Sequence, residues 1–181
     1  CEGNVISDLK HMGIPGIDML NSIGEEILES SRLLTCKYGS SAAHAAGREQ
    51  VMSESSDVEQ RIDGKETSLI ERRGAVAVQM ALGVTTITSY YGWRETDPDE
   101  RRQVLDFWAR LATIVRHGTH LADVAVLYPI RTAWAMYKPV GEVLVTGLMD
   151  EPLRSMDSHL QSISRAILAE GLDFDFIDTR D

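Results

Sequence analysis

The chain has 181 residues, of which 43% are hydrophobic, and its formal net charge at pH 7 is −10. This apolar content supports a buried core, and the negative charge argues against nucleic acid or an anionic membrane as partner, because both need basic patches. No stretch approaches the roughly 20 apolar residues of a membrane span, and the two cysteines, Cys1 and Cys36, form neither a disulfide framework nor a zinc motif.

The first elements predicted are a short strand, a helical region and a second strand. "NVISDLKHMGIPGIDML" (4–20) starts as a strand and breaks at a Gly/Pro turn. "IGEEILESSRLLTCKYGSSAAHAAG" (23–47) is helical, and Gly39 leaves open whether it forms one helix or two. "EQVMSES" (49–55) predicts a strand, followed by a polar loop over 56–66.

The middle of the chain carries clear helix-start signals. Ser68 and Glu71 fit a capping box that opens a helix ending near Gly83. "VTTITSYY" (84–91) is β-branched and aromatic, which is typical of a strand. Asp97 followed by proline and two acids predicts the start of a helix that ends at Gly118, with one apolar face made by Leu105, Trp108, Leu111, Ala112 and Val115.

The C-terminal third predicts one βαβ unit over 122–178. "ADVAVLYP" (122–129) is a nearly continuous apolar run, typical of a strand buried on both faces of a parallel sheet. An amphipathic helix over 156–171 and a strand in "DFDFIDTRD" (173–181) complete the unit. Alternating strands and helices indicate an α/β fold, and we place a domain boundary between residues 118 and 119.

Glu54 is the first candidate for chemistry, because it follows a core-seeking strand directly. In parallel α/β barrels the active site lies at the carboxyl ends of the strands, where a glutamate can act as nucleophile or general base. The alternative is a solvated glutamate that starts a polar loop. The residue alone leaves both open.

Three aromatic residues follow the next strand. Tyr90, Tyr91 and Trp93 could stack on the apolar face of a sugar and hydrogen-bond its hydroxyls. The alternative is a rim of core aromatics. If the two strands are neighbours, these rings lie beside Glu54.

The remaining polar candidates are ambiguous. His11 and Asp18 flank a Gly/Pro turn, and Asp18 could bind substrate hydroxyls or cap a helix. We expect His44 to be a packed helix residue, and His117 and His120 to cap a helix C-terminus. The acidic residues lack a metal-loop spacing, and "GIPG" does not form a phosphate loop, so we predict neither a metal nor a cofactor.

Four blocks follow one another along the chain: "MGIPGIDML", "KYGSSAAHAAGREQVMSES", "ALGVTTITSYYGW" and "HLADVAVLYPI". In this order they resemble the C-terminal part of the catalytic barrel in alpha-L-rhamnosidase-like glycoside hydrolases of family 106. They are also similar, more distantly, to family 42 beta-galactosidases. The resemblance implies a partial (β/α)8 TIM-barrel segment over 1–118, followed over 119–181 by the start of a flavodoxin-like domain.

The resemblance also implies a function. A chain of this family would cleave glycosidic bonds in plant or microbial polysaccharides or glycosides, with Glu54 as the catalytic carboxylate. The sequence leaves the compartment open, although polysaccharide breakdown by bacteria would suit an exported enzyme. The implied substrate-binding residues are Asp18, His11, Ser53, Tyr90, Tyr91 and Trp93. Two departures point to a different sugar or a lost activity: Ser55 and Ser56 follow Glu54 where the family often has glycine, and tyrosines stand where it commonly has histidine.

Length limits the expected activity. A full barrel needs about 250 residues, and a chain that opens at "CEGN" looks like a piece of a longer protein. Glycoside hydrolysis usually needs two carboxylates, and Asp18 is a weak substitute for the second. We therefore expect no efficient hydrolysis by this chain alone, and self-association through exposed strand edges. The alternatives are a non-catalytic carbohydrate-binding α/β domain and a self-contained α/β interaction module.

Overall fold

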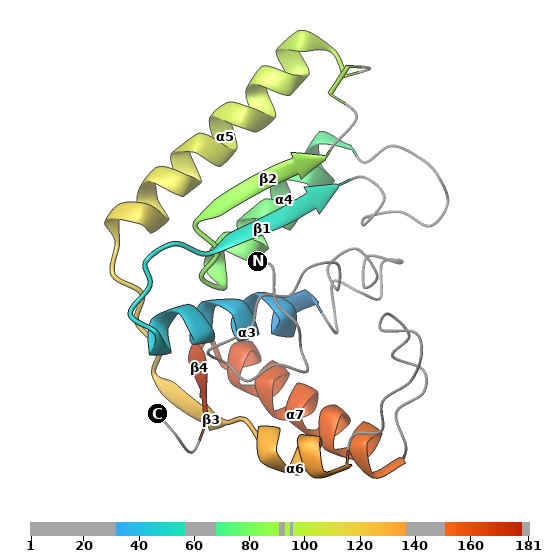
Figure 1. Cartoon of the computed structure of the whole chain (residues 1–181). Coiled ribbons are helices and arrows are strands. Elements are labelled where there is room, and N and C mark those ends of the chain that lie inside the picture. The colour runs from blue at the N-terminus through green and yellow to red at the C-terminus, as the bar shows by residue number, and fades with distance from the viewer. Residues whose placement is uncertain (1–31, 57–67, 91–92, 95, 137–150, 179–181) are drawn as a thin grey trace.

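The computed structural model describes residues 32–56, 68–90, 93–94, 96–136 and 151–178 (Figure 1). Within these ranges strands and helices alternate, and the strands form two separate parallel pairs, β1–β2 and β3–β4. The elements are α3 (Arg32–Ala45), β1 (Met52–Ser56), α4 (Leu69–Ala81), β2 (Thr86–Tyr90), α5 (Pro98–His117), β3 (Val124–Leu127), α6 (Ile130–Met136), α7 (Glu151–Ala169) and β4 (Phe174–Ile177).

The β1–β2 unit consists of β1, α4, β2 and α5. Its strands pair in parallel from Met52 opposite Thr86 to Ser56 opposite Tyr90. Ile87 of β2 packs against a cluster between the two helices, formed by Val76, Met80, Val104 and Trp108. Ile87 therefore packs the sheet against α4 and α5.

The β3–β4 unit consists of β3, α7 and β4. Val124 lies opposite Phe174, and Leu127 lies opposite Ile177, in a parallel pair connected through α7. The core of this unit contains Phe174 and Phe176 of β4, and α3 completes it with Tyr38 and Ala42. A helix that precedes β1 in the sequence thus packs on the last strand.

The two units meet at α3, which runs between the two sheets in Figure 1. A third cluster joins Cys36 of α3 to Val51 before β1 and to Leu82 and Val84 between α4 and β2. Leu168 of α7 packs against the same cluster. Residues before and after position 118 therefore contact one another in this cluster. The domain boundary between residues 118 and 119 stays a prediction.

Local signals in the sequence predict the elements well. The capping box of Ser68 and Glu71 is present, and the Asp97 side chain accepts hydrogen bonds from two amides at the start of α5. All four described strands fall where they were expected, and α/β as the fold class is confirmed. The strand predicted near residue 5 and the loop over 56–66 lie wholly or mostly outside the described residues.

The structure decides between the one helix and two helices left open at Gly39, because α3 runs through this residue without a break. Burial corrects two expectations. Leu105 is 43% exposed and Val104 is fully buried, so Val104 takes the place of Leu105 on the apolar face of α5. The other expected members of that face lie in or against the core: Trp108, Leu111, Ala112 and Val115. β3 is buried on one face only, because Leu127 is 58% exposed. In the β3–β4 sheet, the face of β3 that contains Val126 is buried, and the face that contains Leu127 is exposed. The helix α6 was not expected.

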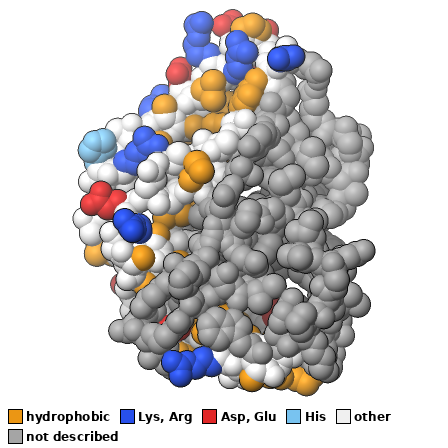
Figure 2. Space-filling model, viewed as in Figure 1, with side chains coloured by type: hydrophobic (Ala, Val, Ile, Leu, Met, Phe, Trp, Pro, Cys, Tyr) orange, Lys and Arg blue, Asp and Glu red, His pale blue; other side chains and the backbone are white. Residues whose placement is uncertain are grey.

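The outer surface of the molecule mixes charge types. On the face shown in Figure 2, basic, acidic and hydrophobic side chains lie interspersed over the region of α5, where Arg102, Arg110 and Arg116 are exposed. None of the helices in the described ranges combines the length and the apolar character needed to cross a membrane.

Candidate functional site

Glu54 lies inside β1, which continues past it to Ser56, and its Cα partner is Thr88 of β2. Ser53 is 2% exposed, whereas Met52 is 41% exposed. Because side chains alternate along a strand, position 54 shares the parity of Met52 and not that of the buried Ser53. Position 54, predicted to be catalytic, and Ser53, predicted to bind substrate, therefore belong to opposite faces of the sheet.

The predicted aromatic residues separate in the structure. Tyr90 ends β2 opposite Ser56, and Tyr91 lies outside the described residues. Trp93 packs edge-on against Trp108 with ring centroids 5.6 Å apart, and its Nε1 donates a hydrogen bond to Ser89 Oγ at 2.7 Å. These contacts are those of a core aromatic, which was the alternative for Trp93.

His11 and Asp18, the remaining predicted substrate-binding residues, also lie outside the described residues. Their roles stay predictions that rest on the resemblance alone. The described part of the predicted sugar site is therefore the paired backbone of β1 and β2.

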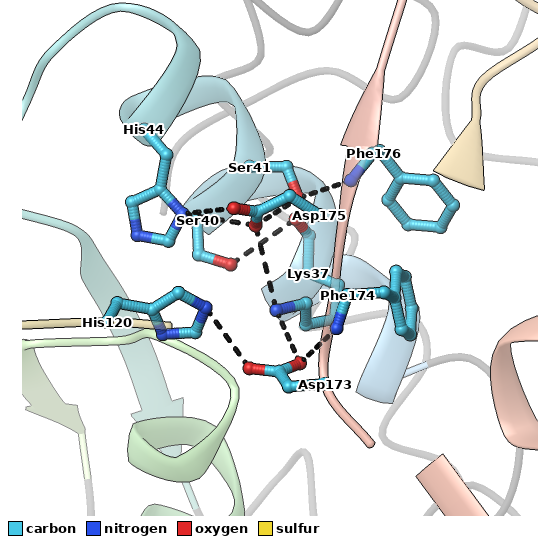
Figure 3. Close-up of polar contacts among 9 residues, drawn as sticks. All are labelled: Lys37, Ser40, Ser41, His44, His120, Asp173, Phe174, Asp175 and Phe176. Carbon is cyan, nitrogen blue, oxygen red and sulfur yellow. Dashed lines mark hydrogen bonds and ion pairs between the residues drawn. The ribbon is translucent and has the colours of Figure 1, made fainter. Parts of the chain in front are cut away.

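A second polar site lies between α3 and β4 (Figure 3), and we call it the α3–β4 charge cluster. It contains Lys37 and His44 from α3, His120 from the α5–β3 connection, and Asp173 and Asp175 around the start of β4. Lys37 is fully buried, and its Nζ lies 2.8 Å from Asp173 Oδ1 and 3.7 Å from Asp175 Oδ1. One ammonium group thus bridges two carboxylates.

Each histidine of the cluster faces one aspartate. His44 Nδ1 lies 3.0 Å from both carboxylate oxygens of Asp175, and His120 Nε2 lies 3.1 Å from Asp173 Oδ2. The two imidazole rings are tilted against each other, with centroids 4.4 Å apart. Both side chains are half-buried, so the cluster is partly open to solvent.

Short hydrogen bonds fix the two aspartates on β4. Ser41 Oγ donates to Asp175 Oδ1 at 3.0 Å and accepts from the Phe176 backbone N–H at 2.9 Å. The Phe174 N–H donates to Asp173 Oδ1 at 2.7 Å. The carboxylates are therefore held by the edge of the strand as well as by the cations.

The surroundings lower the pKa values of both His120 and Asp175. Burial, followed by electrostatic interactions with Lys37 and His44, lowers the pKa of His120, although the carboxylates of Asp173 and Asp175 oppose this. Burial alone would raise the pKa of Asp175, but the hydrogen bond and charge of His44, the Lys37 charge and the Ser41 hydroxyl lower it. Near pH 7 these shifts favour an ionised carboxylate at Asp175 and a neutral imidazole at His120.

The sequence carried a weak signal for this cluster. Lys37, Ser40, Ser41 and His44 recur at helical spacing, so they share one face of α3. His44 is a packed helix residue, as expected, but it also hydrogen-bonds Asp175. Of the two expected helix caps, His117 Nδ1 donates to Thr113 O at 2.8 Å, whereas His120 belongs to the cluster.

Comparison with protein-family models, with curated proteins and with solved structures finds no match for this chain. The two candidate sites are therefore compared by the side chains that they contain. The β1–β2 pair contains Glu54 and Tyr90 of the predicted sugar site, and the α3–β4 charge cluster contains imidazoles, carboxylates and an ammonium group.

Proposed function

We propose that this chain is part of an alpha-L-rhamnosidase-like glycoside hydrolase in which Glu54 is the catalytic carboxylate. The observation that carries the proposal is the parallel register of β1 and β2, with Glu54 opposite Thr88. The carboxyl ends of both strands lie at one edge, where Tyr90 ends β2 opposite Ser56. This is the edge where parallel α/β enzymes place their active sites.

The packing of the sheet supports this proposal. Ile87 contacts the cluster between α4 and α5, and Ser53 is buried, so the helices cover the face to which these residues belong. Position 54 belongs to the opposite face. In a barrel of β/α units the face away from the helices is the interior, which leads to the active-site mouth. The alternation of β1 therefore assigns position 54 to the sheet face away from the helices.

The proposed chemistry divides between this chain and a second carboxylate. Glu54 would attack the anomeric carbon as nucleophile or activate a water molecule as general base. The proton for the leaving oxygen would come from a carboxylic acid on another strand, about 5–5.5 Å away for retention or 6.5–9.5 Å for inversion. Tyr90 and Tyr91 would bind the sugar ring. Trp93 is assigned no contact with the sugar, because it packs on Trp108.

Glu54→Gln in the protein encoded by the complete gene tests the proposal. Hydrolysis of a panel of aryl glycosides, including rhamnosides and galactosides, is measured for the wild type and the variant. A direct chemical role predicts a fall in kcat of about a thousandfold, or ~4 kcal/mol of transition-state stabilisation. The matched control is Glu49→Gln, an exposed carboxylate just before β1, which should leave kcat unchanged.

Two outcomes would overturn the catalytic assignment. Full activity in the Glu54→Gln variant would show that Glu54 has no catalytic role. Saturable sugar binding without turnover, equal in wild type and variant, would identify a carbohydrate-binding domain. The 181-residue chain by itself should show no turnover. Turnover by this chain that disappears in Glu54→Gln would show that the second carboxylate lies within it.

A further inference from the structure

The α3–β4 charge cluster brings together side chains that are typical metal ligands. One nitrogen each from His44 and His120 and a carboxylate oxygen of Asp175 all lie within 4.8 Å of one another. The three residues come from a helix, a connection and a strand, and all three are half-buried. The convergence therefore depends on the tertiary fold and not on a local motif.

We propose that His44, His120 and Asp175 bind a divalent transition-metal ion of the Zn²⁺ type. Two imidazoles and one carboxylate are a common donor set for Zn²⁺, whereas Ca²⁺ and Mg²⁺ prefer oxygen ligands alone. Three protein ligands leave a fourth position for water. The ion would link α3, the α5–β3 connection and β4.

The geometry needs a small contraction to hold the ion. Bonds of about 2.1 Å in a tetrahedral site put ligand atoms roughly 3.4 Å apart. His44 Nδ1 already lies 3.0 Å from Asp175 Oδ2, and the His120 nitrogen, which is within 4.8 Å of both atoms, must approach by at most about 1.4 Å. Asp175 is held in place by Ser41, which leaves the histidine side chains as the parts that move.

Lys37 sets the strength of the site. Its ammonium group lies between Asp173 and Asp175 and neutralises part of the charge that would attract a cation. Metal and ammonium therefore compete for the same carboxylates. Replacing Lys37 by methionine keeps the aliphatic chain, leaves both carboxylates without this cation and makes Asp173 available as a further oxygen ligand. Lys37→Met should therefore bind the ion more tightly than the wild type.

The test titrates the full chain with Zn²⁺ by calorimetry and with Co²⁺ by visible absorption, which reports the coordination geometry. His44→Ala and His120→Ala should each weaken binding at least about 100-fold, because loss of a ligand exceeds the 10–100-fold effect of outer-shell changes. The matched control is His117→Ala, an exposed histidine that bonds Thr113 O outside the cluster and should bind like the wild type. Lys37→Met should gain about tenfold or more in affinity.

Each result decides the question. Absence of binding in both the wild type and Lys37→Met would overturn the proposal, and so would binding that survives loss of His44 and His120. Binding that disappears only in His117→Ala would identify an adventitious surface histidine. Lys37→Met keeps the test valid if the alanine variants do not fold, because it predicts a gain. Glu54→Gln should bind metal like the wild type, so failure of the sugar site and failure of this site are distinguishable.

Discussion

Gly83 shows how tightly single residues are constrained at the junction of the two units. Its φ is +98°, and a Cβ placed there would lie 2.5 Å from Ser40 Cβ and 2.9 Å from Ser40 Oγ. Ser40 is fully buried in α3 and cannot give way. Gly83→Ala should therefore lower the free energy of unfolding by about 2–4 kcal/mol, measured by urea denaturation.

Gly74 provides the matched control for this prediction. It lies within α4, where an added Cβ meets nothing within 4 Å. Gly74→Ala should stabilise the protein by about 0.5–1 kcal/mol, since alanine loses less backbone entropy in a helix. Equal effects of the two alanine substitutions would contradict the contact between Gly83 and Ser40.

Asp157 gives a residue-scale prediction about pH. Burial raises its pKa from 3.8, although the hydrogen bond from Gln161 Nε2 at 2.7 Å opposes this. The folded chain therefore binds a proton more readily than the unfolded chain, and this contribution to stability is lost as pH rises through the folded pKa. Asp157→Asn should gain stability relative to wild type at pH 7, and lose that advantage near pH 3.5. A difference between the two proteins that does not change with pH would contradict the shift.

At the scale of elements, the sequence predicts what local chemistry decides. The capping box at Ser68 and the Asp97 cap fix helix starts by themselves, so both were found correctly. The burial of a side chain depends on which elements pack against it in the fold, and the local sequence does not indicate those elements. Leu127 looked like a core residue, yet one face of the β3–β4 sheet leaves it exposed. Leu105 and Val104 differ by one helical position, which periodicity alone does not resolve.

The attachment of α3 to the edge of β4 is an element-scale feature that can be tested at Ser41. Its hydroxyl bridges Asp175 and the Phe176 N–H, and Ser41 is 1% exposed. Ser41→Ala leaves this buried N–H without its acceptor, so the free energy of unfolding should fall by about 1–3 kcal/mol. Thermal or urea unfolding measures this loss.

Ser162 of α7 provides a control on an exposed helix face. Its hydroxyl donates to the Ser158 carbonyl one turn earlier, a bond that contributes little to helix stability. Ser162→Ala should change the free energy of unfolding by less than about 0.5 kcal/mol. A loss at Ser162 as large as that at Ser41 would contradict the special role of the β4 edge.

At the scale of the whole molecule, the charge cluster could not be predicted from the sequence. His44 and Asp175 are 131 residues apart, and they meet only because α3 packs on β4. The spacing of Lys37, Ser41 and His44 indicates a polar face on the helix. The sequence pattern does not indicate that this face packs against β4. Tertiary topology, which no local signal carries, decides the composition of this site.

Val84 tests whether the two units unfold together. It is fully buried in the cluster that joins Cys36 of α3 to Val51 and Leu82. Val84→Ala should leave a cavity that costs about 2 kcal/mol. Because α3 also completes the core of the β3–β4 unit, amide hydrogen exchange should accelerate in β4 and α7 as well as in β2 and α5.

The control for this experiment is Val78→Ala in α4, where the side chain is 36% exposed and little packing is lost. It should leave exchange in both units near the wild-type rates. If Val84→Ala accelerates exchange in β2 and α5 alone, the β3–β4 unit opens independently and α3 belongs energetically to that unit. If both accelerate together, α3 couples the proposed sugar site to the proposed metal site through a shared core, and metal binding should slow exchange in β1 and β2.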